Sequence, residues 1–209
     1  MIRPLITLSY AQSVDGSIAA APGQPLTLSG PEAMKLTHEL RASHDAILVG
    51  IGTVLADNPR LNVRLASGPQ PQPVVLDSHL RFPLNANLLN HPKPPIIAAA
   101  DHADAQLQAA LELAGAKVIR FPTSDGGHVQ LPALLAWLSQ TGIKSLMVEG
   151  GSGVITSFLS ARLVDRVIIT IAPRFVGGLR AVSAPCDLAL RNVTYRTLGA
   201  DLIVEADTV

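Results

Sequence analysis

The 209-residue sequence contains one cysteine, Cys186, and few aromatic side chains, which make up 3% of the chain. A single cysteine excludes an internal disulfide framework and any multi-cysteine zinc site. The scarcity of aromatic residues argues against a surface on which nucleic-acid bases stack. Basic and acidic residues number 16 each, so the chain also lacks the basic excess of a general nucleic-acid binder. We therefore expect no nucleic-acid partner.

Long apolar runs are also missing, because none reaches the roughly 18–20 residues that span a membrane. The apolar stretch at 4–11 is short and is interrupted by Thr7, Ser9 and Tyr10, unlike a signal peptide. We interpret it as a first β-strand and expect a cytoplasmic protein with no membrane partner. The six histidines lack metal-ligand spacing, so no metal site is predicted.

Short apolar runs alternate with helical patterns, and 48% of the residues are hydrophobic. The predicted strands are 5–11, 46–49, 74–76, 96–99, 117–120, 145–148, 167–171 and 202–205, and the predicted helices are 31–43, 103–114, 131–140 and 152–160. Strands joined through helices of this length pair in parallel. We therefore expect one α/β domain over residues 1–209, with a mostly parallel central sheet flanked by helices. Strands at 194–198 and 202–205, with a turn at 199–201, predict an antiparallel C-terminal hairpin.

The first predicted helix has a recognisable start. Ser29 stands before Pro31 and three residues before Glu32, a pattern typical of a capping box with Ser29 at the N-cap. Ala33, Leu36, Thr37 and Leu40 then fall on one side of the helix.

A glycine-rich turn is the strongest local signal for function. A buried strand ends at Glu149 and continues through Gly150 and Gly151 into a predicted helix. Backbone amides at such a helix start bind anions, so residues 151–156 are a candidate cradle for a cofactor diphosphate. The alternative is an ordinary strand-to-helix turn. Glu149, at the end of a buried strand, needs a polar partner, which a ligand could supply.

A second strand meets glycines before Thr53 and Asp57. These two residues are four apart, so a helical turn would place them on one face, suited to sugar hydroxyls or a nicotinamide carboxamide. The alternative is that residues 57–59 simply end a helix.

Arginines gather nearby at 41, 60 and 64. Their guanidinium groups match phosphate oxygens, although solvated surface charge is the default interpretation of each one.

Six stretches in this order resemble the NADPH-dependent reductase family of riboflavin biosynthesis, which has a dihydrofolate-reductase-like fold. The matching stretches are 7–16, 40–42, 45–59, 61–64, 74–77 and 147–151, and segments 163–165 and 171–173 complete the order. The resemblance implies reduction of a ribosylamino-pyrimidine 5′-phosphate to its ribitylamino form, with hydride passing to C1′ of the sugar. It also implies a homodimer.

The resemblance carries a set of site residues over to this chain. Substrate contacts fall on Arg41, Leu61, Arg64 and Glu149. Cofactor contacts fall on Ala11, Thr53, Asp57, Ser78, Gly151, Ser152, Gly153, Val154, Ile155 and Thr156. Glu149 and, less favoured, Asp57 are the candidates for catalytic proton transfer. Ser78 together with Arg81 is a candidate site for the 2′-phosphate of NADPH.

Some features depart from the bacterial fused members of the family. The sequence has no zinc deaminase signature, so we expect a stand-alone reductase without a deaminase domain. Ser9 stands where those members have lysine, and Pro25 and Thr27 stand where they have serine and tryptophan. The N-terminal stretch is closer to the stand-alone fungal-type reductases. Both the amino and the oxo pyrimidine substrates stay open at this point.

Two other functions stay open as well. A dihydrofolate-reductase-type or other pterin or pyrimidine reductase would need an early carboxylate in the site, for which Asp15 and Glu32 are the candidates. A non-catalytic nucleotide-binding module of the same fold would bind NADPH without turnover.

Overall fold

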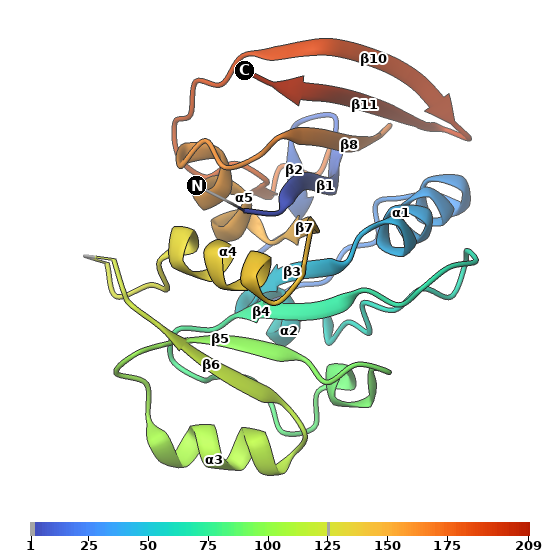
Figure 1. Ribbon diagram of the computed structural model, residues 1–209. Helices are drawn as coiled ribbons and strands as arrows, with labels where there is room; N and C mark the ends of the chain where they lie inside the picture. The colour runs from blue at the N-terminus through green and yellow to red at the C-terminus, as the bar shows by residue number, and fades with distance from the viewer. Residues whose placement is uncertain (1–2, 125) are drawn as a thin grey trace.

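The computed structural model describes residues 3–124 and 126–209, which form a nine-stranded sheet, a two-stranded sheet and five α-helices (Figure 1). The strands are β1 (Leu5–Ser13), β2 (Ser17–Ala19), β3 (Ala46–Gly50), β4 (Gln72–Leu76), β5 (Ile96–Ala100), β6 (Lys117–Phe121), β7 (Ser145–Gly150), β8 (Arg166–Ala172), β9 (Leu179–Arg180), β10 (Leu190–Leu198) and β11 (Asp201–Thr208). The helices are α1 (Pro31–Ser43), α2 (Ile51–Asp57), α3 (Ala105–Leu113), α4 (Leu131–Gln140) and α5 (Ser152–Ser160), with a 3-10 turn η1 (Asn87–Asn90).

The large sheet has the strand order β10-β11-β8-β1-β7-β3-β4-β5-β6. Neighbouring strands from β8 to β6 pair in parallel, whereas β11 runs antiparallel to both β8 and β10. The strands β10 and β11 form the hairpin at the top of Figure 1. The expected mostly parallel sheet with an antiparallel C-terminal hairpin is therefore confirmed.

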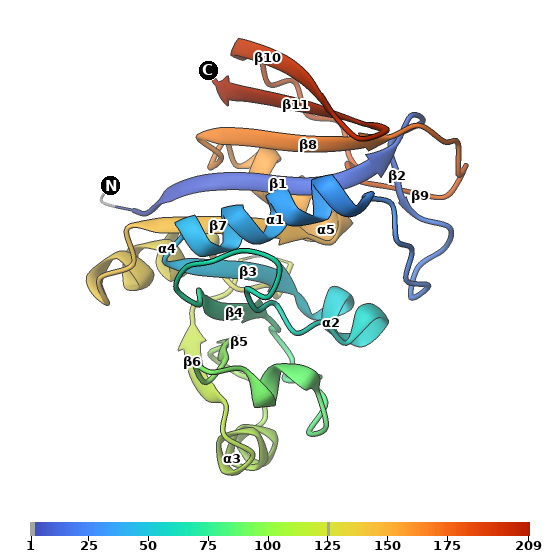
Figure 2. The same ribbon diagram turned by 90° about the vertical axis from the view of Figure 1, so that its right-hand side faces the viewer.

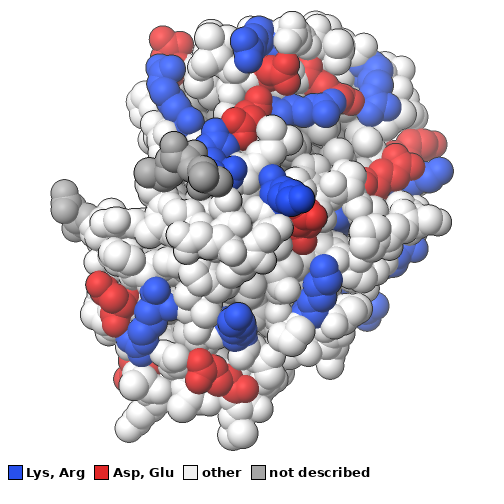
Figure 3. Space-filling model, in the orientation of Figure 1, with Lys and Arg blue, Asp and Glu red and all other residues white. Residues whose placement is uncertain are grey.

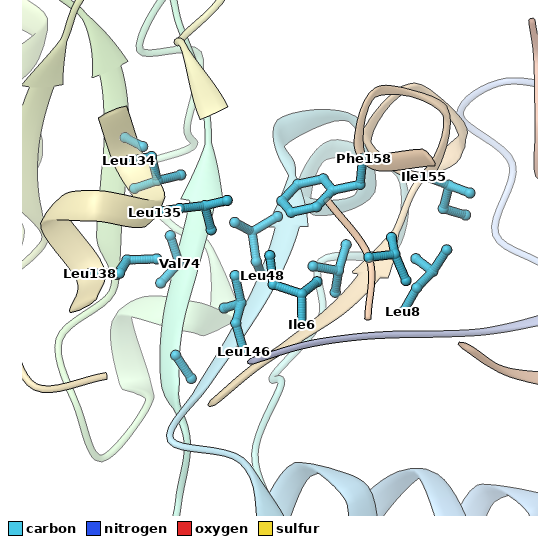
Figure 4. Packing of buried hydrophobic residues seen from close by; sticks show 14 of the residues in the cluster. Ile6, Leu8, Leu48, Val74, Leu134, Leu135, Leu138, Leu146, Ile155 and Phe158 are labelled. Atoms are coloured by element: carbon cyan, nitrogen blue, oxygen red, sulfur yellow. The ribbon is translucent and has the colours of Figure 1, made fainter. Parts of the chain in front are cut away.

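Helices cover both faces of the sheet because the central strands are apolar on both sides. On one face, Leu134, Leu135 and Leu138 of α4 and Phe158 of α5 pack on the strands, as Figure 4 shows. Helices α2 and α3 pack on the opposite face. Figure 2 shows α1 in front of the sheet, where Ala33 packs against β8 and β11. Layers on both faces leave the carboxyl ends of the parallel strands free to form a site.

The predicted bounds of α1, α4 and α5 are confirmed, but the predicted N-cap of α1 is wrong. Gly30, not Ser29, holds that position, and no side chain caps the helix. Instead, Asp201 of β11, which is 3% exposed, accepts a hydrogen bond from the Gly30 amide at 2.7 Å. A carboxylate distant in sequence has replaced the local cap. Asp201 is also paired with Leu198, so the hairpin turn is shorter than predicted.

The surface in Figure 3 carries acidic and basic side chains side by side, as expected for a net charge of zero. Within residues 3–124 and 126–209, no helix has the length and apolar character required to cross a membrane.

Candidate active site

A cleft with a cavity volume of about 880 Å³ opens at the carboxyl ends of β1, β3, β4 and β7. The carboxyl end of β1 points to the right in Figure 2. Ligands of open α/β sheets bind at this edge because loops there are free to differ while the strands stay fixed. Most of the sequence-predicted site residues line this cleft: Ala11, Arg41, Thr53, Asp57, Ser78, Glu149, Gly151, Ser152, Gly153, Val154 and Ile155.

The turn between β7 and α5 forms one wall of the cleft. Gly150 has a φ of +122°, a conformation that side chains other than glycine rarely adopt. Gly151 is the N-cap of α5, and no side chain caps the helix. The amides of the first helical turn have no partner inside an α-helix, so those of Ser152, Gly153 and Val154 are available to an anion.

A second glycine turn, between β3 and α2, lies directly against the first. A Cβ added to Gly50 would be 2.7 Å from Cγ2 of Val154, and one added to Gly151 would be 3.2 Å from Oγ1 of Thr53. The residues 50–53 and 150–154 are called the glycine turns below. Their glycines permit a close approach that brings the starts of α2 and α5 together.

Helix α2 carries Thr53 and Asp57 on the cleft side and then ends. Asn58 has a left-handed conformation, with a φ of 41°, and closes the helix. The interpretation that residues 57–59 end a helix is therefore confirmed, and the contact of Thr53 and Asp57 with a ligand stays a prediction. The Asp57 carboxylate has no hydrogen-bond partner in the described part of the chain. Partial desolvation at the rim of the cleft raises the pKa of Asp57 above its ordinary value.

Arg41 of α1 and Glu149 of β7 meet in the cleft as a bidentate ion pair. Nε of Arg41 donates to Oε1 of Glu149 at 2.7 Å, and Nη2 donates to Oε2 at 2.8 Å. The two side chains are only 10% and 15% exposed. Burial acts to lower the pKa of Arg41, but the Glu149 carboxylate outweighs it and raises that pKa. The partner that a buried Glu149 needs is thus supplied by the protein itself.

Arg60 and Arg64 extend this group into an arginine cluster, defined here as Arg41, Arg60 and Arg64 with Glu149. Partial burial lowers the pKa of Arg64, and the neighbouring guanidinium groups of Arg41 and Arg60 lower it further. Among the described residues, neither Arg60 nor Arg64 forms a salt bridge. The cluster therefore has one neutralised guanidinium and two with uncompensated charge.

Ser78 and Arg81 of the loop after β4 line another part of the cleft, together with His128 from the segment between β6 and α4. Oγ of Ser78 accepts a hydrogen bond from the Val129 amide at 3.1 Å. Asp77 is fully buried, and its Oδ2 accepts from the Phe82 amide at 2.8 Å. Burial raises the pKa of Asp77, and Nε of Arg81 is 3.9 Å from its Oδ1. Asp77 thereby fixes the loop that carries Ser78 and Arg81.

Three sequence-predicted site residues do not line the cleft. Oγ1 of Thr156 is 3.0 Å from Oγ of Ser183 and also accepts from the Ser183 amide. Leu61 is 2% exposed and belongs to the core. Arg64 is exposed beside a small hollow next to α1. The residues where the sequence departs from bacterial family members, Ser9, Pro25 and Thr27, all line the cleft.

The early carboxylates of the alternative function lie outside the cleft lining. Asp15 accepts hydrogen bonds from Ser13, Ser17 and the amides of Val176 and Gly177, which hold its pKa well below the ordinary range. The turn at 13–16 is therefore an anchor for the loop before β9. Glu32 is exposed on the first turn of α1. Within the described residues, no three histidine, cysteine, aspartate or glutamate side chains gather as a metal site requires.

Sequence reasoning missed His38 of α1 and Gln70, which lie behind the arginine cluster. His38 is fully buried, and its Nδ1 accepts from the Arg64 amide at 3.2 Å. One signal was available: His38 and Arg41 are three residues apart on α1, so both polar side chains share one helix face.

The family model described as the RibD C-terminal domain matches residues 4–204. The 2,5-diamino-6-ribosylamino-4(3H)-pyrimidinone 5′-phosphate reductase of Methanothermobacter thermautotrophicus is 40% identical to the chain, over 98% of each sequence. The chain belongs to this family. A reductase of the same name from Archaeoglobus fulgidus is 38% identical over 89% of this chain and 87% of its own length. The expected family, and with it an oxidoreductase of riboflavin biosynthesis, is confirmed.

Solved structures agree with this assignment. The riboflavin biosynthesis reductase Rib7 of Saccharomyces cerevisiae superposes with a TM-score of 0.83 at 31% identity, over all of this chain and 91% of its own. RibD of Acinetobacter baumannii has a TM-score of 0.83 at 27% identity, and this chain spans 58% of it. Dihydrofolate reductase from Enterococcus faecalis, at 14% identity and a TM-score of 0.59, shares the fold. The expected dihydrofolate-reductase-like fold is therefore confirmed.

Proposed function

We propose that this RibD-family chain uses NADPH to reduce 2,5-diamino-6-ribosylamino-4(3H)-pyrimidinone 5′-phosphate to its ribitylamino form. The observation that carries the proposal is that one cleft has a helix start with free amides on one side and the Arg41–Glu149 pair on another. The relatives at 40% and 38% identity are named for this diamino substrate. We therefore favour it over the oxo pyrimidine.

The residues of the glycine turns fit a dinucleotide. Free amides at Ser152, Gly153 and Val154 suit its diphosphate, and nothing lies within 4 Å of the position of a Cβ on Gly153. Thr53 and Asp57 on α2, with Ala11 in the carboxyl-terminal half of β1, face the space for the nicotinamide half. Thr156 holds the Ser183 loop beside this wall. When bound, NADPH supplies the hydride that reduces the sugar carbon.

The 2′-phosphate of NADPH fits the loop after β4. Ser78 keeps its hydroxyl proton available because its Oγ serves as the acceptor for Val129. The Arg81 side chain is 58% exposed, and its charge faces the buried Asp77 only at 3.9 Å. Ser78 and Arg81 together can therefore donate to an added phosphate, which NADH lacks.

The arginine cluster suits the 5′-phosphate of the substrate. Arg41 is already paired with Glu149, so we assign the phosphate to Arg64 and assign Arg41 to holding Glu149 in place. Leu61 is the apolar anchor that fixes the start of the segment carrying Arg64. Each Glu149 oxygen retains a second lone pair for an N–H or O–H of the substrate.

Reduction of the ring-opened sugar imine needs one hydride at C1′ and one proton at the imine nitrogen. Asp57 suits proton donation because its carboxyl has no hydrogen-bond partner among the described residues and its pKa is raised. Glu149 suits hydrogen-bond acceptance because Arg41 holds both of its oxygens. The structure thus supports a division of the two candidate roles between two carboxyl groups.

Absorbance of reduced nicotinamide tests this function when the purified protein is mixed with NADPH and each pyrimidine phosphate. We expect oxidation with the diamino compound, and a KM raised about thirtyfold by Arg64→Ala, as for loss of one charge-assisted contact. Arg174→Ala, at an exposed position that does not line the cleft, is the matched control with an unchanged KM. No oxidation of NADPH with either pyrimidine would overturn the proposal.

We also propose a cytoplasmic homodimer that associates through the C-terminal hairpin. The edge strand β10 has one unpaired side, and Tyr195 and Leu190 on it are 68% and 41% exposed. Light scattering should give twice the chain mass for the wild type and a shift towards the chain mass for Tyr195→Arg. A monomeric wild type at micromolar concentration would reject the association.

A further inference from the structure

The segment Leu61–Arg64 forms no helix or strand, yet side chains from elsewhere form hydrogen bonds with its backbone N–H and C=O groups. Gln70 acts as a substitute for a neighbouring strand: its Oε1 accepts from the Val63 amide at 2.7 Å, and its Nε2 donates to the Val63 carbonyl at 2.9 Å. His38 accepts from the Arg64 amide at 3.2 Å. Three consecutive polar groups are therefore held by two side chains from outside the segment.

Arg41 ties the same segment to the cleft. Its Nη1 donates to the Asn62 carbonyl at 3.3 Å, while its other nitrogens hold Glu149. His38, Arg41 and Ala42 lie on one face of α1, because they are three and four residues apart. A Cβ added to Gly68 would be 2.8 Å from Cβ of Ala42, so the chain passes close to this face on its way to Gln70.

His38 is arranged to accept a hydrogen bond rather than to carry charge. The ring is fully buried, and burial, followed by the charges of Arg41 and Arg64, lowers the pKa of His38 to about 4. With Nδ1 accepting, the proton of the neutral ring is on Nε2, which has no partner among the described residues. A buried donor without a partner is destabilising, whereas the Nδ1 contact satisfies the Arg64 amide.

We propose that His38 and Gln70 are positioning residues that hold Leu61–Arg64 against the Arg41–Glu149 pair and so set the affinity for the phosphorylated substrate. This inference rests on the proposed function, because it assigns the 5′-phosphate to Arg64. Neither side chain lines the cleft. Their effect therefore passes through the backbone of the segment and not through the bound molecules.

Two variants remove the acceptors without removing volume. We expect His38→Leu, which removes one hydrogen bond, to raise KM for the pyrimidine phosphate about tenfold. Gln70→Met removes two hydrogen bonds and should raise it at least as much. The dissociation constant of NADPH and kcat should stay within about twofold of wild type, because the glycine turns are untouched. His38→Asn keeps an acceptor near the position of Nδ1 and should restore KM to within about threefold of wild type.

Gln72→Met is the matched control. Gln72 also donates from Nε2 to a backbone carbonyl, that of Pro94 at 2.7 Å, but it lies at the start of β4, away from the carboxyl ends of the strands. Its KM should equal that of the wild type. An unchanged KM in folded His38→Leu and Gln70→Met would overturn the proposal, as would a joint loss of kcat and NADPH affinity.

Hydrogen exchange separates this inference from the proposed function. In the wild type the amides of Val63 and Arg64 should be protected, and Gln70→Met and His38→Leu should each speed their exchange about tenfold. If the wild type reduces neither pyrimidine, the proposed function fails, and exchange alone decides whether the two side chains hold the segment. Unprotected amides in the wild type would then overturn the inference. Gln70 is half-buried, so Gln70→Met gives a folded test even if His38→Leu does not fold.

Discussion

The two regions proposed to bind the ligands, the glycine turns and the arginine cluster, differ in the kind of group that they offer. The glycine turns offer backbone amides, and each turn is contiguous in sequence, directly after a buried strand. The arginine cluster offers side chains, and its central pair joins Arg41 to a carboxylate 108 residues away. Ligand binding at the glycine turns requires that no Cβ atoms block the backbone amides. Ligand binding at the arginine cluster requires each charged side chain and its partner. Substitutions should therefore affect the two regions in different ways.

The largest effect should follow loss of Arg41. Arg41→Ala leaves Glu149 almost buried without its partner, which should cost about 3 kcal/mol of unfolding free energy and lower kcat/KM more than about 100-fold. Chemical denaturation and steady-state kinetics measure both. In the double variant Arg41→Ala with Glu149→Gln, most of the stability should return but not the activity. Equal stability of Arg41→Ala and the wild type would show that the pair has no structural role.

Acid should weaken the arginine side before the glycine turns. The folded-state pKa of His38, about 4, lies below the ordinary value of 6.5, so the unfolded chain takes up a proton first as the pH falls. The stability contributed by a neutral His38 is fully present above pH 6.5 and is lost as the pH falls towards 4. The loss amounts to about 2 kcal/mol of unfolding free energy at pH 5. The free energy of unfolding of His38→Asn should fall less between pH 7 and 5. Parallel pH profiles for the two proteins would contradict this.

Spreading the glycine turns apart should weaken cofactor binding alone. In Gly50→Ala the added Cβ would contact Cγ2 of Val154 at 2.7 Å, so α2 and α5 must separate. We expect the dissociation constant of NADPH to rise about tenfold with little change in KM for the pyrimidine. Adding Val154→Ala removes the contacting methyl group and should recover part of the affinity. If Gly50→Ala instead raises the pyrimidine KM alone, the two regions have been assigned to the wrong ligands.

The smallest effect concerns the choice between NADPH and NADH. Arg81→Ala should reduce the preference for NADPH about fivefold, measured as the ratio of kcat/KM values, because an exposed arginine contributes modestly to phosphate binding. Arg120→Ala is a control at an arginine that does not line the cleft and that donates to Gln108 and to the Asp101 carbonyl. An unchanged ratio in Arg81→Ala would remove this residue from the 2′-phosphate site.

The parts of the structure that the sequence predicted correctly are those set by local residues, as in the glycine turns. The strand, glycine turn and helix around Gly151 were predictable because all their determinants are local. Helix α2 has only seven residues, too few for a periodic pattern, although the four-residue spacing of Thr53 and Asp57 indicated its shared face. The extent of β10 was missed because an exposed edge strand has no apolar alternation.

The side-chain partners were the part that sequence could not supply. The arginines near position 60 indicated an anion site, but no local pattern shows that Arg41 binds Glu149 or that His38 meets the Arg64 amide. The prediction of the α1 N-cap failed for the same reason, because the Asp201 carboxylate that accepts from the Gly30 amide is 171 positions away in the sequence. Ala11, Leu61 and Ser78 came from family resemblance alone. The structure places Ala11 and Ser78 in the cleft and Leu61 in the core behind it.

A crystal structure of the complex with NADP⁺ and the diamino-pyrimidinone phosphate would test most directly the assignment of the two ligands to the glycine turns and the arginine cluster. The account predicts the cofactor diphosphate on the amides of Ser152, Gly153 and Val154, and the substrate 5′-phosphate within hydrogen-bonding distance of the Arg64 guanidinium. A substrate phosphate on the glycine turns, or a cofactor diphosphate on the arginine cluster, would contradict it.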